Sequence, residues 1–294
     1  MQQIYATKFL VMSPTKHGVF AFYLDDDPIG TCLYYYGEWA EQEFDIISKL
    51  VDVNTNCIDI GSNIGTHTVW LSKRCNQGHI FSIEPQFYIF QVLNTNLVLN
   101  DCFNVLPIHA GIANESGKCL TQIAYPKGYS QKQNYGEFSL LKQNGNEGYP
   151  IDIKQLDEID YFKCDIGFIK MDCELMESNV LISGKKLINK DKPHMYIEFN
   201  WVDGNDEVLN ILKDYGYNCY WHVYDKHNVN NFNKFETNIY VDHTISKTIE
   251  YIPRYYEANL IAIHKEKDKG MFTDKIELGD NIVKWLVRHD MINV

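Results

Sequence analysis

The sequence has few basic residues and no cluster of them. Its 294 residues include 27 Lys or Arg against 39 Asp or Glu, and the formal net charge is −12. Proteins that bind duplex nucleic acids need basic surfaces to neutralise phosphates. We therefore expect no nucleic acid partner, and the charge favours a small-molecule or glycan substrate.

Paired cysteines and long apolar runs are also missing. The eight cysteines are scattered, without a C-x-x-C pair or the Cys/His spacing of a zinc site. No apolar run approaches the ~20 residues that a helix needs to span a bilayer, and the N-terminus lacks the pattern of a secretion signal. These absences predict reduced thiols and a cytoplasmic protein with no membrane span.

Short apolar runs alternate with helical patterns along most of the chain. Strands are expected at 57–60, 79–84, 104–109, 167–172, 195–199, 219–224 and 259–264. Helices are expected at 37–50, 66–74, 88–100, 177–187 and 207–215. Because strands that alternate with helices form right-handed βαβ units, we predict an α/β fold with a doubly wound, mostly parallel sheet and helices on both faces.

The alternation divides the chain into three parts. Residues 1–50 form a lead-in of strands and a helix that packs on the core. Residues 51–265 form the main domain, interrupted at about 113–150 by a polar, Gly-rich insertion of the kind that forms lids and binding loops. Residues 266–294 form a helical extension whose helix, at 276–288, either covers a sheet edge or makes a homodimer contact.

A Gly-rich turn follows the first strand of the alternation. The segment Asp59-Ile-Gly61-Ser-Asn63-Ile-Gly65 lies where that strand gives way to a helix beginning at Thr66. Glycines let the backbone approach a ligand closely, and doubly wound sheets bind ligands at the carboxyl ends of their strands. Glu84 ends the next strand, 19 residues after Gly65, where an acidic side chain can accept hydrogen bonds from ribose hydroxyls.

The turn also discriminates between adenosine ligands. Position 63 is Asn, whereas the dinucleotide fingerprint has a glycine there so that the backbone can meet a pyrophosphate. Asp59 adds a carboxylate that would repel phosphate and attract the ammonium and sulfonium groups of S-adenosylmethionine. Alternatively, Asp59 braces the turn through backbone hydrogen bonds. The residues favour S-adenosylmethionine over NAD as the cofactor.

Several motifs taken together resemble the FkbM-type methyltransferases. They are Cys57–Thr68, Phe81–Gln86, the helix with Asn94, Asn96 and Asn100, Ile169–Glu174 with Glu177, Pro193–Glu198, and Asn259–Ile263. The resemblance runs from about residue 37 to about residue 263. It implies a seven-stranded Rossmann-like methyltransferase sheet with an antiparallel final strand. It also implies an S-adenosylmethionine-dependent O-methyltransferase that acts on a sugar, nucleotide sugar or glycan.

The turn and the resemblance together predict a set of cofactor-binding residues. The set comprises Glu41, Asp59, Gly61, Asn63, Gly65, Thr66, Glu84, Pro85, Ala110, Gly111 and Asp172. By the resemblance, Glu84 would hold the ribose, Ala110 would lie near the adenine, and Glu41 would act near the cofactor from the lead-in helix. The resemblance also places the loop at 134–139 over the active site.

One position departs from the family pattern. The family usually has Asp-x-Glu-Gly after the fourth strand, whereas this chain has Asp172-Cys-Glu174-Leu175. Both carboxylates remain, so the departure concerns the path of the backbone and the access of the substrate.

Transfer of a methyl group to a hydroxyl needs a base or a metal ion, because a hydroxyl is a poor nucleophile at neutral pH. We expect Asp172 to lead the catalysis as base or metal ligand. Glu174 and His222 are the other catalytic candidates. Mg²⁺ prefers oxygen ligands, and Asp172, Glu198 and Asn200 are the candidate ligands at adjoining strand ends.

Other interpretations stay open on the sequence. The carboxylates could instead cap helices or pair with Lys170 or Lys192. The whole protein could be an NAD-dependent sugar oxidoreductase, a methyltransferase with a non-sugar acceptor, or a binding module that kept the fold and lost catalysis.

Overall fold

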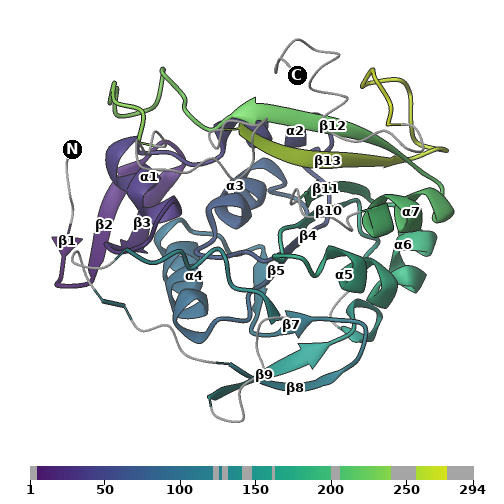
Figure 1. The fold of residues 1–294 in the computed structure, drawn as a ribbon, viewed down its shortest axis with the longest axis horizontal. Coiled ribbons are helices and arrows are strands. Elements are labelled where there is room, and N and C mark those ends of the chain that lie inside the picture. Colours follow the sequence, from purple (N-terminus) through teal and green to yellow (C-terminus); the bar gives the residue numbers. More distant parts are fainter. Residues whose placement is uncertain are drawn as a thin grey trace.

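A seven-stranded sheet forms the centre of the protein (Figure 1). The computed structural model describes residues 5–121, 126–127, 132–140, 148–160, 163–199, 206–239 and 256–276. The strands follow the order β12 (Tyr217–Asp225), β13 (Tyr256–His264), β11 (His194–Glu198), β10 (Phe168–Met171), β4 (Cys57–Ile60), β5 (Ile80–Ile83) and β6 (Val105–Ile108). β13 is antiparallel to both of its neighbours, and the other pairings are parallel. The predicted doubly wound, mostly parallel sheet and its antiparallel final strand are confirmed.

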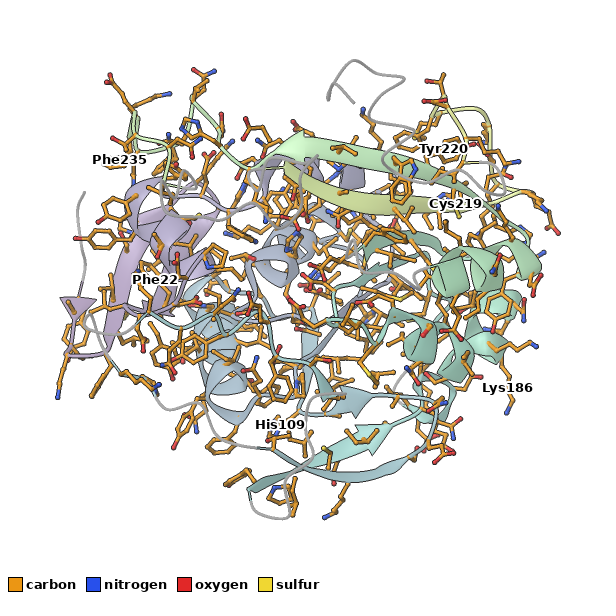
Figure 2. The ribbon with its side chains drawn as sticks, viewed as in Figure 1. Phe22, His109, Lys186, Cys219, Tyr220 and Phe235 are labelled. Atoms are coloured by element: carbon orange, nitrogen blue, oxygen red, sulfur yellow. The ribbon has the colours of Figure 1, made fainter. Side chains whose placement is uncertain are left out.

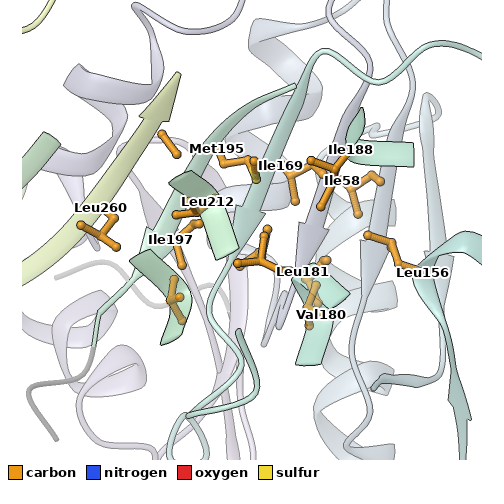
Figure 3. Close-up of a cluster of buried hydrophobic side chains, with 14 of the residues drawn as sticks. Ile58, Leu156, Ile169, Val180, Leu181, Ile188, Met195, Ile197, Leu212 and Leu260 are labelled. Carbon is orange, nitrogen blue, oxygen red and sulfur yellow. The ribbon is translucent and has the colours of Figure 1, made fainter. Parts of the chain in front are cut away.

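Helices cover both faces of this sheet. One face carries α5 (Glu177–Ser183), α6 (Lys185–Asp191) and α7 (Asp206–Asp214), which pack over the apolar cluster of Figure 3. The other face carries α2 (Glu41–Ile47) and α3 (Thr66–Arg74). Successive strand residues point to opposite faces. Ile58 and Ile169 therefore join the apolar cluster under α5, whereas their neighbours Asp59 and Lys170 point to the side of α3.

The lead-in is a small antiparallel sheet followed by a helix. Its elements are β1 (Tyr5–Ala6), β2 (Leu10–Thr15), β3 (Gly18–Tyr23) and α1 (Ile29–Tyr35), of which α1 was not predicted. β3 lies against α4 (Phe87–Leu99). The side-chain amide of Asn96 accepts a hydrogen bond from Ala21 N (2.7 Å) and donates one to Ala21 O (3.0 Å). Asn100, just after α4, makes the same pair with Val19 (3.1 and 2.8 Å). These two amides form hydrogen bonds with the backbone of β3 as a neighbouring strand would.

The insertion after β6 contains strands that the sequence analysis did not place. β7 (Gly111–Ile112), β9 (Tyr149–Lys154) and β8 (Gly117–Thr121) form a three-stranded sheet in that order. β8 is largely exposed or half-buried, so it lacks the alternation of apolar residues that marks a strand in a sequence. The predicted loop insertion at about 113–150 therefore includes β8 and the start of β9.

The predicted helix at 177–187 is two helices in the structure. Gly184 ends α5 and precedes α6, and a short 3-10 turn, η2 (Leu156–Glu158), packs against this junction. A Cβ atom on Gly184 would come within 2.6 Å of Leu156 Cδ2, so η2 packs closely against the chain at the point where α5 ends. The predicted helices at 66–74, 88–100 and 207–215 agree with α3, α4 and α7 to within one residue.

None of the helices in the described residues is long and apolar enough to cross a membrane. The predicted helix at 276–288 lies outside the described residues, apart from Ile276 at its start, which is buried.

Candidate functional site

A cavity of about 430 Å³ lies at the carboxyl ends of β4, β5 and β10. This is the edge at which doubly wound sheets bind ligands. Ten of the predicted site residues line it: Gly61, Asn63, Thr66, Glu84, Pro85, Ala110, Gly111, Asp172, Glu174 and Glu198. Four do not, namely Glu41, Asp59, Gly65 and His222, and Asn200 lies outside the described residues. The fold thus brings most of the predicted site together.

The turn after β4 depends on two glycines in the left-handed conformation. Gly61 has a φ of +76°, and a Cβ atom there would come within 1.7 Å of the carbonyl oxygen of Asp172. Gly65 has a φ of +90°, and its Cβ atom would come within 2.6 Å of Leu93 Cδ1. Gly65 is the residue before α3 rather than part of the cavity lining. Both glycines shape the turn, and only Gly61 borders the space where a ligand would lie.

Glu84 lies just after β5 and is held by backbone N–H groups. Its Oε2 accepts a hydrogen bond from Asn63 N (2.9 Å), and its Oε1 accepts one from Gln86 N (2.8 Å). The side chain lines the cavity, although the residue is only 3% exposed. Burial raises the pKa of Glu84 to about 7, against the lowering effect of the two backbone donors. The carboxyl group is therefore fixed in position and close to its titration point at neutral pH.

Asp59 does not face the cavity, which corrects the expectation of a carboxylate near the ligand. It is fully buried, and its Oδ2 accepts a hydrogen bond from Thr68 Oγ1 (2.6 Å). Its Oδ1 lies 3.8 Å from Lys170 Nζ. Lys170, the register partner of Asp59 on β10, points to the same side of the sheet and lines the cavity in its place.

Lys170 is a buried cation held by two carboxylates. Its Nζ lies 3.0 Å from Asp172 Oδ2, which confirms the alternative pairing of these residues, and 3.8 Å from Asp59 Oδ1. Burial alone would lower the pKa of Lys170, but the charges of Asp172 and Asp59 outweigh it and raise the pKa. Lys170 consequently stays charged at neutral pH.

Glu43, rather than Glu41, brings α2 to the cavity. Glu41 accepts hydrogen bonds from Lys16 Nζ and pairs with His17 Nε2, both at 2.6 Å, outside the cavity lining. Two residues along a helix correspond to about 200° of rotation, so Glu43 points the other way and lines the cavity. Its Oε2 lies 2.7 Å from His67 Nε2. The prediction chose the correct helix and the wrong face.

The Glu43 carboxylate is strongly stabilised in its ionised form. Burial alone would raise its pKa, but His67 and the hydroxyl of Tyr224 lower the pKa to about 2. Asn259 Nδ2 also donates to Glu43 Oε1 (3.1 Å) and contacts Tyr196 Oη (2.9 Å). These residues form one buried polar network along the wall of the cavity.

The late strands supply a group of lining residues that sequence reasoning missed. They are Tyr196 on β11, Tyr224 on β12, Lys226 after β12, and Glu257 and Asn259 on β13. Lys226 and Glu257 form an ion pair. One signal could have found the last two: an antiparallel final strand begins at the edge where the parallel strands end, so polar residues at its start belong to the site.

His222 lies behind the cavity wall. Its Nδ1 lies 2.7 Å from Tyr196 Oη, and its ring stacks on Tyr224 at 4.9 Å between centroids. Both tyrosines line the cavity, and His222 does not. Burial lowers the pKa of His222 to about 4, so the imidazole is neutral at physiological pH. His222, a predicted catalytic candidate, therefore contacts two lining tyrosines without lining the cavity itself.

Three carboxylates converge at the carboxyl ends of β10 and β11. Oxygens of Asp172, Glu174 and Glu198 lie within 4.8 Å of one another. Burial and the charges of Asp172 and Glu174 raise the pKa of Glu198 well above its ordinary value. Glu174 and Leu175 both have positive φ angles, +52° and +74°. Leu175 therefore adopts the backbone conformation that a glycine at this position would favour, and the carboxylates stay at the cavity.

The described lining of the cavity is strongly acidic. It contains seven Asp or Glu residues and two lysines: Glu43, Glu84, Glu137, Asp172, Glu174, Glu198 and Glu257, with Lys170 and Lys226. Each lysine is paired with one of these carboxylates. A cationic or neutral ligand suits this field, and a pyrophosphate opposes it.

Comparison with known proteins identifies one family and several solved structures with a similar fold. The model of the family described as Methyltransferase FkbM domain matches residues 59–219, more than half of the chain. No curated protein is significantly similar in sequence.

Three solved structures illustrate what the fold is similar to. The methyltransferase FkbM of Methylobacillus flagellatus KT is 17% identical with a TM-score of 0.44, over 78% of this chain and 49% of that one. The precorrin-6y C5,15-methyltransferase of Geobacter metallireducens GS-15 is 13% identical with a TM-score of 0.44, over 76% and 87%. M. jannaschii TYW2 in complex with AdoMet is 13% identical with a TM-score of 0.43, over 88% and 87%. The chain thus spans about half the length of the Methylobacillus protein.

Proposed function

This chain belongs to the FkbM methyltransferase family, and on that premise we propose that it is an S-adenosylmethionine-dependent O-methyltransferase. The observation that carries the proposal is the cavity itself. Glu84, the Gly61 turn and the pair Ala110–Gly111 border one acidic space together with Asp172. The acceptor in this proposal is a hydroxyl of a sugar, nucleotide sugar or glycan.

The lining favours this cofactor over NAD. S-adenosylmethionine carries a sulfonium and an ammonium group, which an excess of carboxylates attracts. In the proposal, Glu84 accepts the ribose hydroxyls, and Ala110 and Gly111 lie beside the adenine. Glu43 takes the part expected of Glu41, because its ionised carboxylate lines the same cavity. The NAD-dependent oxidoreductase is the weaker alternative, since its pyrophosphate would meet carboxylates and an Asn side chain at position 63.

When bound, S-adenosylmethionine would supply an electrophilic methyl group for an in-line displacement. The acceptor oxygen would bond to the methyl carbon as the bond from carbon to sulfur breaks, which would leave a neutral thioether. The proton of the hydroxyl passes to a carboxylate oxygen, for which Asp172 is the candidate. Lys170, 3.0 Å from Asp172 Oδ2, orients that carboxylate. The protein otherwise positions the reactants and excludes water.

A second proposed role for the carboxylates of the cavity is to bind a metal ion. Asp172, Glu174 and Glu198 are the described groups that would hold Mg²⁺, and the predicted ligand Asn200 lies outside the described residues. A bound Mg²⁺ would stabilise the developing alkoxide of the acceptor.

Calorimetry with S-adenosylmethionine tests the cofactor assignment. We expect the wild type to bind it and Glu84→Ala to bind roughly 100-fold more weakly, because two hydrogen bonds to a charged group are lost. Glu115→Ala, at an exposed residue outside the cavity lining, is the control and should bind like the wild type. Binding of NAD in place of S-adenosylmethionine would overturn the proposal.

The pKa of Glu84 predicts how cofactor affinity depends on pH. Only the ionised carboxylate accepts hydrogen bonds with both oxygens, and its pKa of about 7 in the free protein exceeds that in the complex. Affinity should therefore be complete above this pKa and lost as the pH falls through it, about tenfold between pH ~8 and pH ~6. Glu84→Gln should remove this Glu84-dependent tenfold step. An unchanged pH profile in that variant would contradict the assignment.

A further inference from the structure

Part of the cavity wall comes from the loop at 132–140. Asn134, Gly136, Glu137, Phe138 and Leu140 all line the cavity. A Cβ atom on Gly136 would lie 3.8 Å from Asn63 Nδ2, so the loop reaches the turn after β4. How this loop is held therefore decides how closely a ligand at the turn is enclosed.

Asp25 holds the loop from the lead-in. The residue is fully buried, and its Oδ2 accepts hydrogen bonds from Lys127 N (2.6 Å), Gln133 Nε2 (2.8 Å) and Tyr135 Oη (3.3 Å). Gln133 N also donates to Asp25 O, and Asp27 N donates to Gln133 O, both at 2.8 Å. One carboxylate oxygen and a short stretch of backbone pairing thus attach the loop to the segment between β3 and α1.

Tyr135 connects this attachment to the base of the cavity. It is 2% exposed, and its ring lies 5.6 Å from that of Tyr23. Its carbonyl oxygen accepts a hydrogen bond from Gln86 Nε2 (2.8 Å), and Gln86 N donates to Glu84 Oε1 (2.8 Å). Asp25 is therefore linked to Glu84 through only two intervening residues.

We propose that Asp25 is a positioning residue for cofactor binding, which holds the loop at 132–140 against the ligand at Glu84. This rests on the proposed function, because it takes that ligand to be S-adenosylmethionine. Asp25 is not among the residues that line the cavity. It acts through the three donors on Oδ2, and it limits the positions that the loop can take before the ligand arrives.

Two replacements of Asp25 distinguish the contribution of its acceptor oxygen from that of its charge. Asp25→Ala removes the acceptor, and we expect the Kd for S-adenosylmethionine to rise about tenfold with little change in kcat at saturating cofactor. Asp25→Asn keeps one oxygen for the three donors and should stay within about threefold of the wild type. Trypsin should also cleave after Lys127 and Lys132 faster in Asp25→Ala, and the cofactor should slow that cleavage.

A matched control distinguishes positioning from stability. Asp157 accepts hydrogen bonds from the backbone N–H groups of Lys186 and Leu187, both at 2.9 Å. Lys186 lies far from the lead-in, which contains Phe22 (Figure 2). Asp157→Ala should lower the melting temperature and leave the Kd unchanged. Gln133→Ala, which leaves the buried carboxylate in place, should raise the Kd even if Asp25→Ala does not fold.

The outcomes separate the two proposals. A wild type that does not bind S-adenosylmethionine removes the proposed function. A wild type that binds it, with Asp25→Ala and Gln133→Ala binding equally well, overturns the role of Asp25 alone. An equal rise in Kd for Asp157→Ala would assign the effect to lost stability and would also overturn that role.

Discussion

Gly61→Ala is expected to abolish cofactor binding and to lower the free energy of unfolding by about 3 kcal/mol. The added Cβ atom would lie 1.7 Å from the carbonyl oxygen of Asp172, and neither backbone segment can move without separating β4 from β10. The φ of +76° adds strain for any residue with a side chain. Denaturant unfolding and calorimetry with S-adenosylmethionine measure the two effects.

Gly270→Ala is the matched control for this variant. Gly270 has a similar φ of +73°, but no atom lies within 4 Å of the position of its Cβ. It should therefore cost only the conformational strain, about 1 kcal/mol, and leave the affinity unchanged. If the two variants proved equally stable and bound the cofactor equally, the close contact between Gly61 and Asp172 would be refuted.

Asp172→Asn is expected to lower kcat at saturating cofactor by a factor of about 10²–10⁴. The amide keeps the shape of the side chain and can no longer take the proton of the acceptor hydroxyl. Single-turnover assays with a reactive sugar acceptor measure the effect. Asp165→Asn is the control, because Asp165 also pairs with a lysine, Lys190 at 2.9 Å, but is exposed and outside the cavity.

The same assay distinguishes a base from a metal ligand. With Asp172 as base, wild-type turnover should be the same in EDTA and in Mg²⁺. With Asp172 as a metal ligand, EDTA should stop the wild type, and Glu198→Gln should be impaired as well. A kcat for Asp172→Asn equal to that of the wild type would exclude both roles.

The parts of the site that the sequence predicted are those encoded locally. The Gly61 turn, Glu84 and the pair Ala110–Gly111 each follow a parallel strand of the central sheet within a few residues, so one pattern places both the strand and the residue after it. Leu175 also illustrates local encoding. It stands where a glycine was expected from the family pattern, and it still has a positive φ angle. The backbone of this motif therefore tolerates the replacement of glycine by leucine.

The residues that miss the cavity lie on the predicted elements, at positions that the sequence alone does not resolve. Glu41 lies on the other side of α2 from Glu43, which lines the cavity. Asp59 and His222 share a strand face with the lining residues Lys170 and Tyr224, but they lie behind them and do not reach the cavity. Residues such as Glu257 and Asn259 were missed because they reach the site only through the distant pairing of β13 with β11.

The amides of α4 also constrain the order in which the nascent chain can fold. Ala21 meets its partner Asn96 across 75 residues, and Val19 meets Asn100 across 81. At a translation rate of ~5–20 residues per second, roughly 4–15 s separate the synthesis of β3 from that of Asn96. The lead-in therefore leaves the ribosome before α4 and must wait for that helix before β3 can dock. During that interval apolar side chains of the lead-in that are buried in the finished protein, among them Phe20 and Phe22, lack the surface of α4 and are open to chaperones.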